Sequence, residues 1–363
     1  MSAMGNLQKI RCKTTRCMNN DFPSDFTSTL LRWFDSHGRQ LPWRETHDPY
    51  AIWLSEIILQ QTQVKQGWDY WLRFMERWPR VEMLAEATED EVLRLWQGLG
   101  YYSRARNLHH AAKQIVEMGG FPQTMEGIRS LKGVGDYTAA AIGSIAFGWP
   151  VAVVDGNVYR VLSRYFGIET PINTTAGKHE FTAMAQELLP EKQASAFNQA
   201  MMDFGATQCM PQAPRCADCP LMVSCVAFRE ERVRQLPVKL KTLKVRERRL
   251  IYIYIRCKGF VAIHRRGAGD IWQGLWEPLL IENDDWHMDD WLAMHGGNDT
   301  KCVVKCLKRH VRHVLTHRVL LADFYLIESG ARLTLPADYV WVDEADLNQY
   351  GVPRLVEKLF ELL

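Results

Sequence analysis

Two carboxylates in this sequence stand where acid and electrostatic catalysis could use them. Glu56 has apolar neighbours on both sides of its turn in a predicted helix, so burial should raise its pKa and let it donate a proton near neutral pH. Asp155 follows the apolar run 151–154 and precedes a predicted helix. An acid and an anion of this kind can together cleave a glycosidic bond. The alternatives are a solvated helix face for Glu56 and a simple helix N-cap for Asp155.

Four cysteines follow the spacing C-x6-C-x2-C-x5-C on a short, proline-containing segment. They are Cys209, Cys216, Cys219 and Cys225. Four thiolates at this spacing can surround one iron–sulfur cluster or one zinc ion, and the residues alone leave both open. Unligated surface thiols are the weaker alternative, because four reduced cysteines so close together are prone to oxidation.

Residues 131–139 suggest a phosphate-binding turn between two helices. Gly133, Val134 and Gly135 allow a turn whose backbone N–H groups point outward, with a helix N-terminus behind them. An ordinary helix–helix turn is the alternative. Gln60 and Gln61, which follow Glu56 in the chain, have long, uncharged side chains that can pair with base edges.

The composition limits how the chain could bind nucleic acid. Its 363 residues carry 44 Lys and Arg against 42 Asp and Glu, a net charge of +2, so binding cannot rest on bulk positive charge. The 47% of hydrophobic residues exclude a disordered protein. Nine cysteines, four of them clustered, do not suit a disulfide-stapled secreted domain. With no signal-peptide pattern at the start, we expect a soluble, cytoplasmic monomer.

The elements that would position these residues fall into two regions. Residues 25–228 are predicted to form successive helices, among them one from Asp48 to about Gln66. Residues 250–363 are predicted to form an α+β domain. Residues 1–24 are expected to be an extension. Residues 229–249, with nine Lys or Arg and three Glu, are expected to be a linker.

Taken together, these motifs resemble the endonuclease III superfamily of base-excision DNA glycosylases. The resemblance joins the Glu helix (SEIILQQTQV), the helix–hairpin–helix with its aspartate (LKGVGDYTA to VDGNV) and the four-cysteine loop, in the family's order. The branch it most resembles is MutY, which removes adenine opposite 8-oxoguanine. The resemblance implies a 4Fe–4S cluster on the four cysteines.

The resemblance also assigns roles to single residues. It implies that Glu56 protonates the leaving adenine and that Asp155 stabilises the cationic sugar, with Tyr137 and Asn157 positioning the sugar, Asp155 and the water. Other positions that it implies contact DNA or the flipped base are Trp43, Arg44, Gln61, Tyr101 and Asp203. Because the lyase branch has a nucleophilic Lys where Tyr137 stands, we expect a monofunctional enzyme.

Residues 250–363 resemble the Nudix-like domain that reads 8-oxoguanine in this family. The metal-binding glutamates of a true Nudix hydrolase are missing after Gly274, so hydrolase activity is not expected. The family's Phe-Ser-His loop corresponds to Leu315-Thr316-His317, which keeps the hydroxyl and imidazole and lacks the aromatic ring. The stretch 301–318 has six Lys or Arg and no acid, which suits DNA phosphates or a solvated basic face.

The sequence therefore predicts a multidomain α and α+β protein: an all-α helix–hairpin–helix glycosylase domain with an iron–sulfur loop at 209–225, then a Nudix-like domain. The expected partner is double-stranded DNA with an A:8-oxoguanine or A:G mismatch. The alternatives are a thymine- or uracil-mismatch glycosylase of the same superfamily and a non-catalytic DNA-lesion binding protein.

Overall fold

The computed structural model describes residues 22–240, 246–282, 286–296 and 301–363. The chain forms two compact units, each built from two separate stretches. The first comprises Met1–Gln40 and Gly148–Lys239, and the second comprises Leu41–Phe147 and Leu240–Leu363. Helices therefore alternate between the units along the chain, so that the expected helical region contributes to both.

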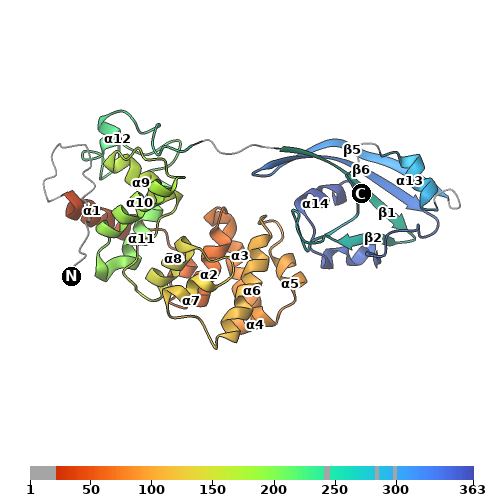
Figure 1. Ribbon diagram of the computed structural model, residues 1–363, viewed down its shortest axis with the longest axis horizontal. Helices are drawn as coiled ribbons and strands as arrows, with labels where there is room; N and C mark the ends of the chain where they lie inside the picture. Colours follow the sequence, from red (N-terminus) through yellow and green to blue (C-terminus); the bar gives the residue numbers. More distant parts are fainter. Residues whose placement is uncertain (1–21, 241–245, 283–285, 297–300) are drawn as a thin grey trace, which may run out of the picture. The chain divides into compact units, whose positions relative to one another are not determined.

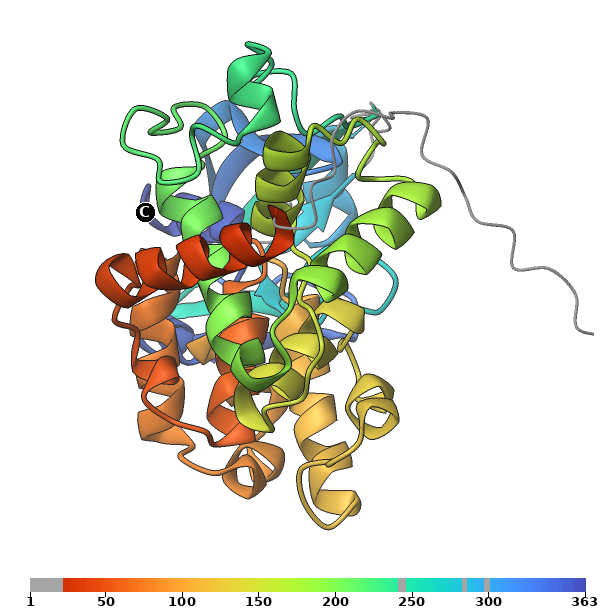
Figure 2. The ribbon, with the colours of Figure 1, turned by 90° about the vertical axis from the view of Figure 1, so that its left-hand side faces the viewer.

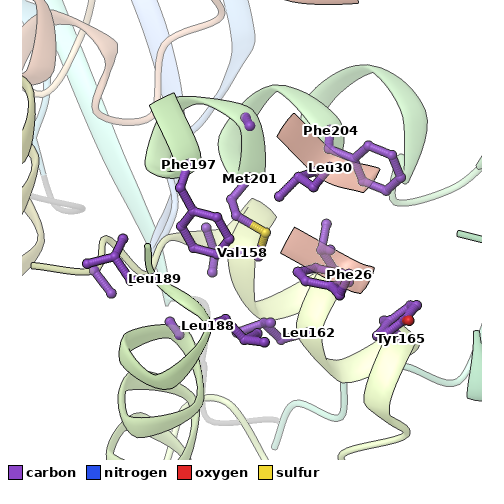
Figure 3. Close-up of a cluster of buried hydrophobic side chains, with 14 of the residues drawn as sticks. Phe26, Leu30, Val158, Leu162, Tyr165, Leu188, Leu189, Phe197, Met201 and Phe204 are labelled. Carbon is purple, nitrogen blue, oxygen red and sulfur yellow. The ribbon is translucent and has the colours of Figure 1, made fainter. Parts of the chain in front are cut away.

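The first unit is all-helical. Its elements are α1 (Phe22–His37), α9 (Gly156–Phe166), α10 (Thr175–Leu188), η2 (Glu191–Gln193), α11 (Ala194–Asp203), the π-helical η3 (Phe204–Gln208) and α12 (Val226–Arg229). Figure 2 shows α1, in red, among the green helices of this unit. Apolar residues at helical spacing hold it together: Phe26 and Leu30 of α1 meet the buried faces of α9 and α11 (Figure 3). This core fixes the start of α9, where Asp155 lies.

The helical part of the second unit is labelled in Figure 1. Its elements are η1 (Pro42–Arg44), α2 (Pro49–Leu59), α3 (Val64–Arg77), α4 (Val81–Glu86), α5 (Glu89–Leu95), α6 (Ser103–Glu117), α7 (Met125–Ser130) and α8 (Asp136–Ala146). The helix expected to run to Gln66 ends at Leu59, so that part of the prediction is wrong. The backbone leaves the helical conformation at Gln60, whose ψ is 113°, and Gln61 follows in the left-handed region with φ of 56°.

The other part of the second unit is a mixed sheet with flanking helices (Figure 1). The strands are β1 (Arg246–Cys257), β2 (Phe260–Arg265), β3 (Trp276–Glu277), β4 (Leu279–Ile281), β5 (Cys302–Val314), β6 (Arg318–Ser329) and β7 (Tyr339–Asp343); α13 (Met288–Met294), η4 (Glu344–Gln349) and α14 (Arg354–Phe360) complete it. The sheet order is β3-β2-β1-β6-β5, with β1 and β6 parallel. The predicted change from an all-α to an α+β region is confirmed.

One further boundary differs from the sequence-based expectation. Strand β1 already begins at Arg246, inside the stretch 229–249 expected to be a linker, while residues 241–245 lie outside the described residues. Cys302 and Cys306, four residues apart, both lie in strand β5. Among the described residues, no helix is both long and apolar enough to cross a membrane.

Candidate functional site

Helix α2 carries Glu56 in the interior of the second unit. It begins with Asp48, whose carboxylate accepts a hydrogen bond from the Tyr50 N–H at 3.0 Å, followed by Pro49 at the first helical position. The helix is buried on all sides, and Glu56 is only 7% exposed. The solvated helix face considered for Glu56 is therefore wrong. A carboxyl group in such surroundings can hold a proton and deliver it to a bound base.

Two glutamines follow α2 and point in different directions. The Gln60 amide donates to the Thr138 hydroxyl at 3.3 Å and so joins the end of α2 to α8. Gln61 is exposed and has a positive φ. Gln60 thus has a structural contact, whereas Gln61 is presented to solvent, where DNA could reach it.

The predicted hairpin lies between α7 and α8. Gly133 has φ of 80°, and a Cβ there would come within 2.8 Å of Asn107, so the turn needs glycine on both counts. Val134 is anchored in the core at 9% exposure, while Gly135 is the N-cap of α8 and has open space around it. This eleven-residue helix thus begins beside open space at Gly135, and a helix N-terminus is a favourable place for an anion. Tyr137 follows in the first turn of α8, half-buried.

In the first unit, both carboxylate oxygens of Asp155 are held in place. One accepts hydrogen bonds from the N–H groups of Asn157 and Val158, at 2.8 Å each, and the other accepts from the Asn157 side-chain amide at 2.7 Å. The backbone bonds are those of an N-cap. The hydrogen bond from the Asn157 side chain to the second oxygen is more than an N-cap requires. Burial raises the pKa of Asp155, and these hydrogen bonds and Arg160 oppose the shift.

Arg160, which sequence reasoning missed, connects this aspartate to the cysteine loop. Its guanidinium donates to the Asn157 side-chain oxygen at 2.8 Å, to the Gly205 carbonyl at 2.7 Å and to the Cys209 carbonyl at 2.7 Å. Arg160 is 9% exposed. The available signal was a pair of arginines, Arg160 and Arg164, four residues apart on one face of a helix that has no other charged residue.

The four cysteines lie together in the first unit. All four line one small cavity of about 30 Å³, and the described cysteines are free thiols. Arg164 donates to the Cys209 sulfur at 3.4 Å. Burial, together with the neighbouring cysteines, raises the pKa of the Cys219 thiol to about 12, and a bound cation would relieve this by stabilising the thiolate.

The choice between zinc and a cluster can be tested on this geometry. No three His, Cys, Asp or Glu side chains in the described ranges converge so as to hold one metal ion. Four cysteine sulfurs that line one cavity without converging on one point suit a cluster with several iron atoms better than one tetrahedral zinc, whose four sulfurs must all lie about 2.3 Å from one point.

The three residues considered for a base pocket differ in their surroundings. Trp43 is buried, with its ring 5.9 Å from Trp68 and 5.8 Å from Trp71. Asp203 is fully buried, and Arg39 binds its carboxylate through backbone and guanidinium donors. Arg44 lies in the short helix η1 and is partly exposed. A role for these three in binding a base stays a prediction.

The loop 315–317 lies at a cavity of about 640 Å³ within the second unit. Tyr101, Thr316 and His317 line it, and the hydroxyls of Tyr101 and Thr316 are hydrogen-bonded. Trp272 also lines it, with a positive φ of 61° and its ring 6.0 Å from His313. Tyr101 and Thr316, which the resemblance assigns to DNA contact and to the Phe-Ser-His loop, thus meet, and the Trp272 ring lines the same cavity although position 315 is Leu.

Two family models match the chain. Residues 54–190 match the HhH-GPD superfamily base excision DNA repair proteins, and residues 251–362 match the NUDIX domain. These matches confirm the predicted superfamily and the Nudix-like region.

Several proteins of known name are similar to the chain. It is 45% identical to mouse adenine DNA glycosylase over 222 residues, which is 58% of this chain and 43% of the mouse protein, so the match spans less than half of that relative. It is 30% identical to adenine DNA glycosylase from Buchnera aphidicola subsp. Schizaphis graminum over 348 residues, 93% of this chain and 98% of that protein. A solved thermostable thymine-DNA glycosylase is 31% identical, with a TM-score of 0.55, covering 58% of this chain and 98% of that one.

Proposed function

Because this chain belongs to the adenine DNA glycosylase family, we propose that it excises adenine mispaired with 8-oxoguanine or guanine from double-stranded DNA. The observation that carries the proposal is the fixing of both carboxylate oxygens of Asp155. An N-cap needs one of them. Holding the second as well suits a carboxylate that must present negative charge in one direction.

The proposed reaction divides the work between two carboxyl groups. Glu56 gives its proton to the adenine ring, so that the electrons of the breaking bond between sugar and base leave with a neutral base. Asp155 stabilises the positive charge that remains on the sugar. Water then adds to the sugar carbon and gives a proton to the Glu56 carboxylate, which restores the acid. The base must leave the stack for this chemistry, at a cost of about a few kcal/mol.

Tyr137 makes the enzyme monofunctional in this proposal. A lyase needs an amine that attacks the sugar and forms a Schiff base, and a phenol cannot do so. Tyr137 and Asn157 have positioning roles: Asn157 binds Asp155 directly, and Tyr137 lies in the first turn of α8 behind the hairpin.

Recognition of the DNA involves three further surfaces. The open N-terminus of α8 behind Gly133 and Gly135 suits a backbone phosphate. Gln61 and Tyr101 are exposed side chains suited to filling the gap left by the flipped adenine. Thr316 and His317 supply hydrogen-bonding groups for the opposite purine in the cavity that Tyr101 lines.

The four cysteines hold a 4Fe–4S cluster in this proposal. They surround one cavity, and Arg160 and Arg164 donate to the carbonyl or sulfur atoms of Cys209 beside it. A bound cluster would fix the loop 209–225, whose Cys209 carbonyl accepts from Arg160 of α9, and so support the residues that orient Asp155. A monomer in the cytoplasm stays the expectation from the sequence.

A thymine or uracil glycosylase is the competing activity, because the similar thermostable protein is named for thymine. The test incubates the protein with duplexes carrying A opposite 8-oxoguanine, A opposite G, and T or U opposite G. We expect release of adenine, with intact strands until base or heat is applied. Release of thymine or uracil alone would mean that one of these bases, and not adenine, is the substrate. Strand cleavage before base or heat is applied would refute the role of Tyr137. Tight mismatch binding without release would indicate a non-catalytic protein.

A further inference from the structure

Two exposed residues of the second unit have a backbone conformation that residues other than glycine rarely adopt. Gln61 has φ of 56° and Tyr101 has φ of 46°. Neither is glycine, so each conformation is strained and persists only when its surroundings impose it. Both are residues that the proposed function presents to DNA, which raises the question of what holds them.

One buried guanidinium contacts the chain immediately before both residues. Arg104 is 8% exposed and lies in the first turn of α6. On one side it donates to the carbonyl oxygens of Ile57, Ile58 and Gln60, at 3.1 and 3.0 Å for the first two. On the other side it donates to the carbonyl oxygens of Leu99 and Gly100, both at 3.3 Å.

The position of this cation is otherwise unfavourable. A positive charge in the first turn of a helix opposes the helix dipole, so α6 gains nothing from it. Its favourable partners are the carbonyls at the end of α2, which have no N–H partner within that helix. The guanidinium also lies 5.1 Å from the Trp96 ring centroid and 5.6 Å from that of Tyr101. Burial lowers the pKa of Arg104 to about 10, so it stays charged at neutral pH.

We propose that Arg104 is a positioning residue for the DNA-inserting side chains: it ties the segment before Gln61 to the segment before Tyr101 and so fixes the distance between them. The inference rests on the proposed function, because it assigns a use to two side chains that face DNA. Arg104 itself is buried and is not expected to touch the nucleic acid.

The test compares Arg104→Gln and Arg104→Lys with Lys113→Gln, which removes an exposed cation from the same helix. Without DNA, hydrogen exchange of the amides at 60–63 and 99–102 reports directly on whether Arg104 holds the two segments together, a link that we call the tether. With DNA, 2-aminopurine beside an A:8-oxoguanine mismatch reports unstacking, and the Kd is measured for mismatched and fully paired duplexes.

We expect Arg104→Gln to lose exchange protection in both segments while cooperative thermal unfolding is retained. It should weaken mismatch binding about tenfold, within the range expected when one base no longer stacks on an aromatic side chain. Binding to paired DNA should stay within about twofold, since phosphate contacts carry it. Arg104→Lys, which keeps the charge and has fewer donors, should fall between Arg104→Gln and the wild type. Lys113→Gln should match the wild type.

The inference would be overturned if Arg104→Gln showed the same hydrogen exchange in both segments and the same unstacking as the wild type. Equal losses on mismatched and paired duplexes, or loss of cooperative unfolding in both Arg104 variants, would also overturn it, because Arg104 would then serve the fold alone. A wild-type protein that does not distinguish the mismatch would instead refute the proposed function. In that case the exchange experiment still reports on the tether.

Discussion

Replacing Gly205 by alanine tests how tightly the residues around Asp155 are arranged. Gly205 lies in the π-helical segment η3, and a Cβ there would meet the Cβ of Asn157 at 2.5 Å, its Cα at 2.9 Å and its carbonyl oxygen at 3.0 Å. The first two distances are shorter than real Cβ atoms show, so either η3 or the start of α9 must move. Asn157 is the residue that binds both Asp155 and Arg160.

The expected cost follows from this overlap. Overpacking of a buried site typically costs about 1–3 kcal/mol, which corresponds to a fall of roughly 3–10 °C in melting temperature for a unit of this size. A displacement of about 1 Å at Asn157 would also misalign Asp155, and misplacement on that scale can reduce a catalytic rate by about 100-fold. We therefore expect the loss of activity to exceed what unfolding at the assay temperature explains.

The assay is single-turnover release of adenine below the melting transition, with thermal unfolding measured on the same samples. Gly156→Ala is the matched control for stability, because a Cβ at Gly156 meets nothing within 4 Å and the residue opens helix α9. It should unfold at or slightly above the wild-type temperature. A Gly205→Ala protein with wild-type melting and rate would refute the idea that Asn157 is locked in place.

Three further predictions concern charge and the cysteine loop. Burial raises the pKa of Asp155, and only its ionised form stabilises a cation. The rate should therefore fall as the pH drops through a pKa above the ordinary value of about 3.9. A pH–rate profile whose acidic fall lies at or below that value contradicts this prediction. Replacing the exposed Lys305, Lys308 and Arg312 of β5 by Gln should lower the slope of log Kd against log salt by about 1 for each phosphate that the protein no longer binds, whereas an unchanged slope places β5 away from DNA. Cys219→Ser should abolish stoichiometric iron and acid-labile sulfide in the purified protein, and full retention of both would exclude Cys219 as a ligand.

The sequence was sufficient wherever a local rule decides the structure. The pair Asp48 and Pro49 indicated where α2 begins, and the helix starts there. Gly133 indicated the hairpin because its backbone conformation and its packing against Asn107 both exclude a side chain. The α+β region expected from residue 250 likewise contains the central strand β1, whose residues from Leu250 onward are largely apolar.

Features set by distant parts of the chain were not predictable. Helix α2 stops at Leu59 where Arg104, more than forty residues later, binds its last carbonyls. Strand β5 lacks apolar alternation because it is an edge strand, exposed along most of its length, with bulges and lysines of the kind that protect sheet edges. Arg160 was missed because its role depends on the carbonyls of Gly205 and Cys209.

The central claim is that two carboxyl groups release adenine, and the most direct measurement is single-turnover adenine release by the wild type, Glu56→Gln and Asp155→Asn. Each substitution keeps the size of the side chain and removes either the proton donor or the negative charge. We predict that the wild type releases adenine opposite 8-oxoguanine, and that both variants bind this duplex and release adenine at least about 100-fold more slowly. Release at the wild-type rate by either variant would contradict the account.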